Sequence, residues 1–434
     1  MILLFFLLYL IIGLNFLYPF IIRYFGFPPL PTMSEQLLIV AFFILVYLNS
    51  AISNKKPNIY YSYLRIYAYL FLSFLLIEIF SAFLNSNSFL LVIKSMISFS
   101  IIYLLFFLAI IEMDMNEKGQ RKVIEFIYAM ILVQIPVTIF QYLFMNYSSA
   151  DYNSGTISSA NAGGTGTIGI LMLFLQAFLI SQIMVKGFNI KRIVLILLTL
   201  VPIVVGGVRL GIVLSPITII LTVCGYYFLN PNKVSKKAYN GIITIIFTVI
   251  TMFILIAVVI PTTKYSSYLD LNVLTNEKNF EEYNNSKLSQ SRTLPYYILF
   301  KYTLNSDINY LVGNGNEEIT QSKMANVGRA KLSNRNAYPD AILILASNGI
   351  IGLSLVIMIF ATGIKILRNY VKIEVSEFMR IVSYSIIPIT FLSIISLFYT
   401  NAWSEQICLC YWVILAVLLQ RYITLHRIKN VIAA

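Results

Sequence analysis

Residues 241–260 read GIITIIFTVITMFILIAVVI, an uncharged apolar stretch that is followed after Pro261 by a long polar segment. A helix needs about 20 apolar residues to cross the roughly 30 Å hydrocarbon core of a bilayer. Similar apolar runs occur at residues 1–22 and 89–111, and the whole chain is 59% hydrophobic and 11% charged. Because soluble domains carry roughly a quarter charged residues, this composition predicts an integral membrane protein.

The apolar runs predict an all-α polytopic fold. The strand alternation of a membrane β-barrel is absent from the sequence, and helices are the other backbone arrangement that satisfies its own hydrogen bonds in lipid. We count about twelve transmembrane helices, at residues 2–21, 37–53, 62–84, 89–111, 122–145, 165–185, 192–206, 210–229, 240–261, 340–364, 380–399 and 405–422. Nine of them fall within residues 1–261, a long loop follows at 262–339, and residues 340–434 hold three more and a basic tail.

Basic residues occur in every second loop of this arrangement. They include Lys55, Lys118, Lys186, Lys236, Arg368 and the tail from Arg421 to Lys429. The alternate loops at 85–88 and 146–164 carry no Lys or Arg. The positive-inside rule then predicts that both termini are cytoplasmic and that the 262–339 loop is extracytoplasmic. Orientation thus accounts for the net charge of +13, and no nucleic-acid partner is expected.

The 262–339 loop is the one large polar element of the sequence, so we expect the chemistry of the protein there. Its nine Lys/Arg and seven Asp/Glu nearly balance, which favours a structured element over a basic tail. Residues 294–304, LPYYILFKYTL, predict a short amphipathic helix on the outer membrane surface, with Pro295 in its first turn. Turns are predicted at 305–307 and 313–315.

Arg209 is a charge at the predicted outer boundary of the membrane. It lies in VVGGVRLGIV, residues 204–213, between the seventh and eighth spans. A charge at that depth is costly and is retained with a partner or a function. Gly206, Gly207 and Gly211 leave room for a ligand or for close helix packing. The alternative is an arginine that snorkels and anchors the interface.

Three arginines of the loop are expected on the same side as Arg209, namely Arg292, Arg329 and Arg335. Two guanidinium groups can clamp a pyrophosphate through bidentate hydrogen bonds. Arg209 and Arg292 therefore predict an anion site, which Arg329 and Arg335 would extend. The alternative for each loop arginine is a solvated charge.

Glu78 and Lys94 predict an intramembrane ion pair. Each lies about six residues from the outer end of its span, and the loop between the two spans is short. The two side chains are therefore expected at matched depth on neighbouring antiparallel helices, where each offsets the cost of burying the other. We interpret the pair as structural.

Several kinds of site are absent from the sequence. The one histidine, His426, lies in the predicted cytoplasmic tail, and neither an acidic cluster nor a Walker A phosphate loop is found. Cys224, Cys408 and Cys410 lie in apolar runs and are interpreted as apolar packing. The enzymatic option that remains is metal-free chemistry on a negatively charged substrate, with no metal and no cofactor expected.

The order and sidedness of these features resemble those of the O-antigen polymerase and ligase superfamily, over about residues 150–360. The residues that carry the resemblance are, in order, Gly155, Thr156 and Asn161; Gly206, Gly207, Val208 and Arg209; Ser291 and Arg292; LVGNG at 311–315; Asn336, Ala337 and Tyr338; and SNGIIG at 347–352. These motifs are degenerate, so their order carries more weight than any one of them.

The resemblance implies a glycosyltransferase of the bacterial cytoplasmic membrane that polymerises undecaprenyl-diphosphate-linked repeat units on the outer face, without metal. It implies that Arg209 and Arg292 hold the diphosphate. The residues implied to bind substrate are Arg329, Arg335, Asn336, Tyr338, Gly313 and Gly315. Implied partners are the lipid-linked donor and acceptor glycans, membrane lipids and a chain-length regulator protein. The product would be O-antigen, capsule or another exopolysaccharide.

One departure from the family pattern, one unassigned role and one alternative function bear on this interpretation. Ligases of this family carry an external His before the Asn of the tenth-span motif, where this chain has Arg335, and this favours a polymerase. The general base is unassigned, and Asp340, Glu317 and Glu318 are candidates that otherwise serve as solvated or helix-capping acids. A flippase or transporter is the alternative, although the sequence offers no matching pair of interrupted helices in its two halves.

Overall fold

The computed structural model describes the chain in several ranges. The described residues are 2–27, 34–53, 58, 62–85, 101–145, 153–157, 164–230, 246, 250, 254, 306–315, 340–374, 376–399 and 406–433. Every regular element within these ranges is helical, and nine of their helices are long and apolar enough to cross a membrane. The protein is therefore an all-α, multi-pass membrane protein, as the apolar runs predict.

The nine long helices are α1 (Ile2–Phe25), α2 (Ser34–Ile52), α3 (Ser62–Leu84), α6 (Glu117–Phe144), α7 (Thr165–Lys186), α10 (Arg209–Leu229), α15 (Asp340–Tyr370), α16 (Glu377–Leu397) and α17 (Gln406–Ala433). Four shorter helices are α5 (Ile102–Glu112), α8 (Ile190–Leu198), α9 (Leu200–Val205) and α13 (Asp307–Val312).

Three of the twelve expected spans have no single long helix among the described residues. The fourth is represented by α5, which covers its second half, and the seventh consists of α8 and α9, which meet at Thr199. The ninth, at 240–261, lies outside the described residues except for three isolated positions. The count of twelve therefore stays a prediction.

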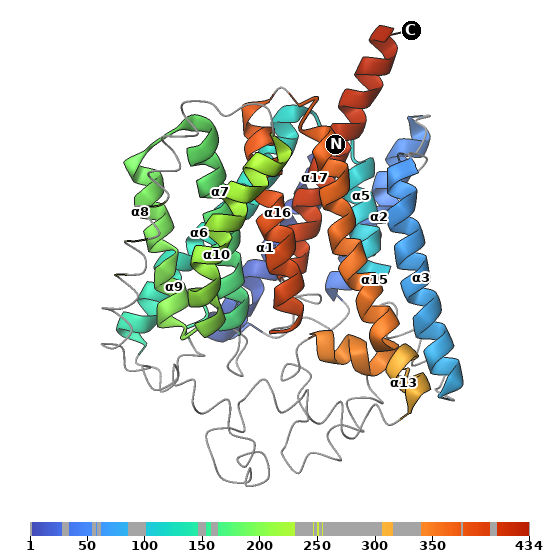
Figure 1. The fold of residues 1–434 in the computed structure, drawn as a ribbon, viewed down its shortest axis with the longest axis horizontal. Helices are drawn as coiled ribbons and strands as arrows, with labels where there is room; N and C mark the ends of the chain where they lie inside the picture. The colour runs from blue at the N-terminus through green and yellow to red at the C-terminus, as the bar shows by residue number, and fades with distance from the viewer. Residues whose placement is uncertain are drawn as a thin grey trace.

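The helices pack side by side, and both chain ends lie toward the same end of the bundle (Figure 1). We call it the terminal end. Lys118 and Arg121 at the start of α6, Lys186 at the end of α7 and Arg368 near the end of α15 belong to it. The far end holds the turn between α9 and α10, the helix α13 and the start of α15 (Figure 1). This separation follows the alternation of basic loops, while the side of a membrane that each end faces stays a prediction.

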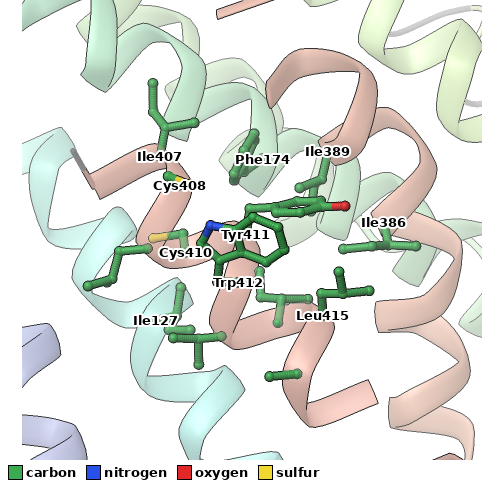
Figure 2. Close-up of a cluster of buried hydrophobic side chains, with 14 of the residues drawn as sticks. Ile127, Phe174, Ile386, Ile389, Ile407, Cys408, Cys410, Tyr411, Trp412 and Leu415 are labelled. Carbon is green, nitrogen blue, oxygen red and sulfur yellow. The ribbon is translucent and has the colours of Figure 1, made fainter. Parts of the chain in front are cut away.

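The core is densest around α17, whose first four turns are buried on all sides. A helix that is apolar around its whole circumference belongs in the centre of a bundle. The Trp412 ring lies 5.2 Å from that of Phe107 and 5.7 Å from that of Phe360, and Cys408 and Cys410 are buried beside it (Figure 2). Both thiols are free, which agrees with their interpretation as apolar packing.

One glycine of α15 allows it to pack closely along α3. A Cβ atom at Gly363 would lie 3.1 Å from the Tyr67 hydroxyl oxygen, whereas one at Gly352 would overlap the Asn348 side chain of α15 itself and would only reach ordinary contact with the Phe74 ring, at 3.6 Å. Small residues let neighbouring helix backbones approach within membranes. The long arm of α15 is thereby fixed against α3 before any polar contact is considered.

α15 is interrupted at Gly349, where φ is +65° and ψ is −168°. The tenth span is expected at 340–364, whereas the helix extends to Tyr370 and consists of two arms. Residues 340–348, which we call the half-helix, turn away from the long arm at the far end (Figure 1). Few L-residues adopt a positive φ with ψ near 180°, so the direction of the half-helix depends on a glycine at this position.

Candidate functional site

Two motifs that are distant in the sequence meet at the far end. The backbone N–H of Asn314 donates to the Ala346 carbonyl at 2.7 Å, and that of Gly315 donates to the Ser347 carbonyl at 3.0 Å. These carbonyls belong to the last turn of the half-helix, where carbonyls lack intrahelical partners. We call this contact between residues 313–315 and residues 346–349 the glycine junction.

The glycine junction leaves no space for a side chain at two positions. A Cβ atom at Gly313 would overlap the backbone of Ser347, and one at Gly349 would overlap the backbone of Leu311. The φ angles of Gly313, Gly315 and Gly349 are +78°, +87° and +65°. The turn predicted at 313–315 is therefore present, and its glycines are required by close backbone approach as well as by chain reversal.

The helix α13 leads directly into this turn and contributes a hydrogen bond to it. Ser306 is its N-cap, and the hydroxyl oxygen accepts a hydrogen bond from the backbone N–H of Asn309 at 3.2 Å. Gly313 ends the helix, and the Asn309 side-chain amide donates to the Asn314 side-chain oxygen at 2.9 Å. The turn predicted at 305–307 is wrong in part, because Asp307 is already helical: a serine cap followed by an acidic residue starts a helix as readily as a turn.

The end of α3 also contacts the junction, through Ser81 and through Asn85, the residue that follows the helix; neither is predicted from the sequence. The Ser81 hydroxyl donates to the Ser347 carbonyl at 2.9 Å, and the Asn85 amide donates to the Gly313 carbonyl at 3.3 Å. These residues are four apart and so share one face of the helix. Two small polar residues at one face of an otherwise apolar helix end are a weak signal of a polar contact.

The segment 153–157 is anchored to α6 by two buried glutamines. The Gln141 amide donates to the Gly155 carbonyl at 2.7 Å, and its oxygen accepts the Gly155 N–H at 2.8 Å. The Gln134 oxygen likewise accepts the Thr156 N–H at 2.8 Å. Gly155 and Thr156, which carry part of the family resemblance, are thus held rigidly against the bundle.

Arg209 is the first residue of α10 and lies at the far end. Gly206 closes the preceding turn, with its N–H donating to the Pro202 carbonyl at 2.9 Å, and a Cβ atom at Gly206 would lie 3.4 Å from the Thr165 side chain. The first turn of α10 has no acidic residue, and Val208 at the N-cap gives no side-chain cap. The structure describes the backbone of Arg209 and not its side chain.

Asp340 begins the half-helix and is fully buried. Its carboxyl group interacts electrostatically with Cys408, in the first turn of α17. In Figure 1 the half-helix runs from the middle of the bundle toward α13, while the start of α10 lies on the other side. The structure therefore joins Gly313 and Gly315 to the half-helix of Asp340. The start of α10, which is Arg209, lies at the same end of the bundle (Figure 1).

The remaining predicted site residues fall outside the described residues. They are Arg292, Arg329, Arg335, Asn336, Tyr338 and Lys94, together with Glu317 and Glu318. Glu78 is described and lies buried on α3, one turn before Ser81. Its pairing with Lys94 stays a prediction.

The pairing can be tested by measuring the folded yield of Glu78→Gln, Lys94→Met and the double variant. If the two charges offset each other, each single variant loses yield because it leaves one charge buried, and the double variant recovers part of the loss. A double variant that is no better than the worse single variant would remove the support for the pair. Ser383→Ala, a buried change on α16 that breaks a hydrogen bond within the helix at 2.8 Å, is the control.

Comparisons with known proteins assign this chain to no family. No protein-family model matches the chain, and no curated protein matches it.

Proposed function

We propose that this protein polymerises polyprenyl-diphosphate-linked glycan repeat units at the far end of its helix bundle. The observation that carries the proposal is the glycine junction, because it joins the 311–315 and 347–352 motifs of the family resemblance in one hydrogen-bonded unit. The two motifs meet through backbone contacts that leave no room for a Cβ atom. Their glycines therefore have the same structural cause. The resemblance thus rests on a spatial relation as well as on sequence order.

The start of α10 supports an anionic substrate. The first N–H groups of a helix carry a partial positive charge and favour an anion. Arg209 adds a full positive charge in that first turn, where no acidic residue offsets it. A diphosphate bound there would offset both positive charges.

In the proposed reaction, a hydroxyl oxygen of the acceptor repeat unit attacks the anomeric carbon of the growing glycan. The bond between that carbon and the diphosphate oxygen breaks, and the electron pair leaves with the carrier diphosphate. Arg209 and Arg292 stabilise the developing charge on the leaving group. The hydroxyl proton passes to a base, for which the buried Asp340 is the candidate. The products are a lengthened lipid-linked glycan and free polyprenyl diphosphate.

A flippase or transporter is the second candidate, and the interrupted α15 is the observation that favours it. In many transporters the carbonyls freed at such a break coordinate ions or substrate. Here the Ala346 and Ser347 carbonyls accept hydrogen bonds from Asn314, Gly315 and Ser81. Their use in a fixed contact weighs against an ion site. A ligase would use the same donor with a different acceptor, and the absence of an external His from the sequence weighs against it.

Arginine variants test the proposal in proteoliposomes supplied with one lipid-linked repeat unit. Arg209→Ala and Arg292→Ala are each expected to lower the rate of glycan extension about a hundredfold or more, the effect of removing one donor to a developing negative charge. Arg121→Ala, which changes an exposed arginine at the terminal end, is the control. Unchanged extension in both site variants would exclude them from diphosphate binding.

A further inference from the structure

Polar contacts join the half-helix to α3. The packing of α3 on the long arm of α15 does not depend on them. The Ser347 carbonyl accepts two hydrogen bonds, one from the Gly315 N–H and one from the Ser81 hydroxyl. The Asn85 amide bridges the Ser81 carbonyl at 2.8 Å and the Gly313 carbonyl at 3.3 Å. The last turn of α3 and the residue that follows it therefore hold the last turn of the half-helix and the 313–315 turn at once.

These contacts act on the half-helix more than on the long arm of α15. The long arm already packs on α3 through Gly363 against Tyr67. Ser81 is fully buried, so its hydroxyl needs an acceptor, and that acceptor is a carbonyl at the break. A rigid joint at a break fixes the direction of the arm beyond it, and here that arm leads to Asp340.

On the basis of the proposed function, we propose that Ser81 and Asn85 are positioning residues that hold the half-helix and the 313–315 turn in one arrangement and thereby set the place of Asp340 for glycan transfer. Neither residue needs to touch substrate. Catalysis depends steeply on such placement, since an error of about 1 Å can cost on the order of a hundredfold in rate.

Three variants of Ser81 and Asn85 test the hydrogen bonds themselves. Ser81→Ala removes the donor, Ser81→Thr keeps an Oγ donor, and Asn85→Asp replaces the amide donor facing the Gly313 carbonyl with an acceptor. Ser383→Ala is the matched control, because that buried hydroxyl bonds within its own helix to the Met379 carbonyl at 2.8 Å. The readout is amide hydrogen exchange of residues 313–315 and 340–349 in lipid nanodiscs.

Exchange at Asn314 and Gly315 is expected to be about fivefold faster in Ser81→Ala and in Asn85→Asp, the factor that corresponds to loss of one neutral hydrogen bond. Ser81→Thr and Ser383→Ala are expected to exchange like the unchanged protein. In the glycan extension assay, Ser81→Ala and Asn85→Asp are expected to lower kcat about tenfold with KM unchanged, because placement of the reacting groups is disturbed and binding is not.

Faster exchange with lower kcat, both restored in Ser81→Thr, supports the proposal. Unchanged exchange in Ser81→Ala and Asn85→Asp overturns it, and so does faster exchange with full kcat. Absence of glycan extension by the unchanged protein would contradict the proposed function, and the exchange rates would still decide whether α3 holds the half-helix.

Discussion

Gly349→Ala is expected to lower the free energy of unfolding by about 3 kcal/mol or more. The φ and ψ angles at this position cost an L-residue roughly 1–3 kcal/mol. The added Cβ atom would also overlap backbone atoms of Leu311, which cannot move aside as the end of a flexible side chain can. Overpacking of this kind costs about 1–3 kcal/mol more. The measurement is the midpoint of unfolding in a denaturing-detergent titration, together with the rate of glycan extension.

Gly187→Ala separates the two costs. Gly187 follows α7 with φ of 87° and ψ of −174°, close to the angles at Gly349, yet its Cβ atom would meet no described atom within 4 Å. It should show the backbone cost alone and keep full activity. Equal losses in the two alanine variants would mean that the close contact at the glycine junction does not contribute to stability.

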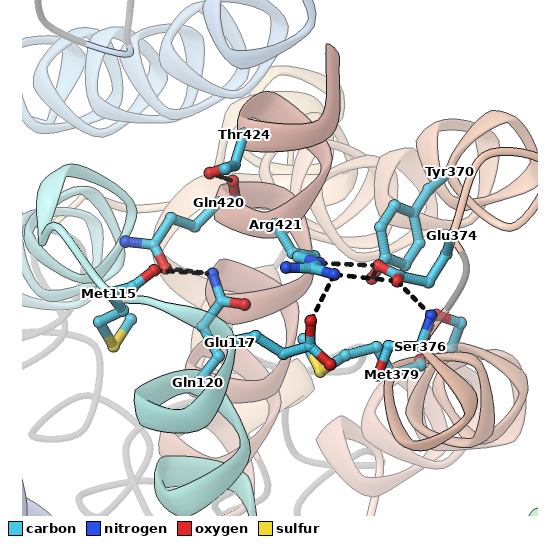
Figure 3. Close-up of polar contacts among 11 residues, drawn as sticks. Met115, Glu117, Gln120, Tyr370, Glu374, Ser376, Met379, Gln420, Arg421 and Thr424 are labelled. Atoms are coloured by element: carbon cyan, nitrogen blue, oxygen red, sulfur yellow. Dashed lines mark hydrogen bonds and ion pairs between the residues drawn. The ribbon is translucent and has the colours of Figure 1, made fainter. Parts of the chain in front are cut away.

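Arg421→Met is expected to lower the free energy of unfolding by about 3–5 kcal/mol, the usual cost of breaking a buried ion pair from one side. The Arg421 Nε lies 3.0 Å from Glu374 Oε2, and their side chains are 13% and 0% exposed. Tyr370 and Ser376 also donate to Glu374, and Glu117 accepts from Arg421 at 2.8 Å (Figure 3). This network joins α6, α15, α16 and α17 at the terminal end, so its loss should also be visible as reduced folded yield.

The exposed pair of Arg121 and Glu125 supplies the control, with side chains 58% and 47% exposed. Arg121→Met should cost no more than about 2 kcal/mol, since an exposed ion pair contributes at most about 1 kcal/mol and the contact with the Phe378 ring contributes a similar amount. The double variant Arg421→Met/Glu374→Gln should be no less stable than Arg421→Met alone, because no buried charge is left without its partner. A double variant much less stable than either single variant would contradict the ion-pair account.

Hydrophobic runs were sufficient to predict the membrane class and the position of most helices. A transmembrane helix is selected by the length and apolarity of its own segment, so local sequence determines where α1, α7 and α16 begin within a few residues. Helix ends at the terminal side extend further than the apolar window, as in α17, since charged residues continue a helix into the aqueous layer. Hydropathy averaged over a window of residues does not detect such extensions.

The break in α15 is harder to predict for the same reason. Asn348 and Gly349 form a turn dipeptide, yet they sit in an apolar run long enough to be one span. The decision between a continuous helix and two arms depends on whether another segment pairs with the freed carbonyls, and that segment is 313–315. Local propensity alone does not contain this information.

Contacts between distant elements were also missed. Ser81 and Asn85 contact carbonyls that are more than 200 residues away in the sequence, and their role depends on the half-helix packing against α3. From the sequence, Arg421 is predicted to be one of several cytoplasmic charges. Its ion pairs with Glu374 and Glu117 become apparent in the fold. The sequence shows which polar and charged side chains need partners. Which residues become those partners depends on tertiary packing.

The central claim is that this chain extends lipid-linked glycans, and its most direct test is the length of the products formed by the purified protein. Proteoliposomes containing the unchanged protein receive a single polyprenyl-diphosphate-linked repeat unit, with and without a metal chelator. The account predicts a ladder of products that differ by one repeat and that form equally well with chelator present. Repeat units that keep their length while moving to the other leaflet would contradict the account and support a flippase.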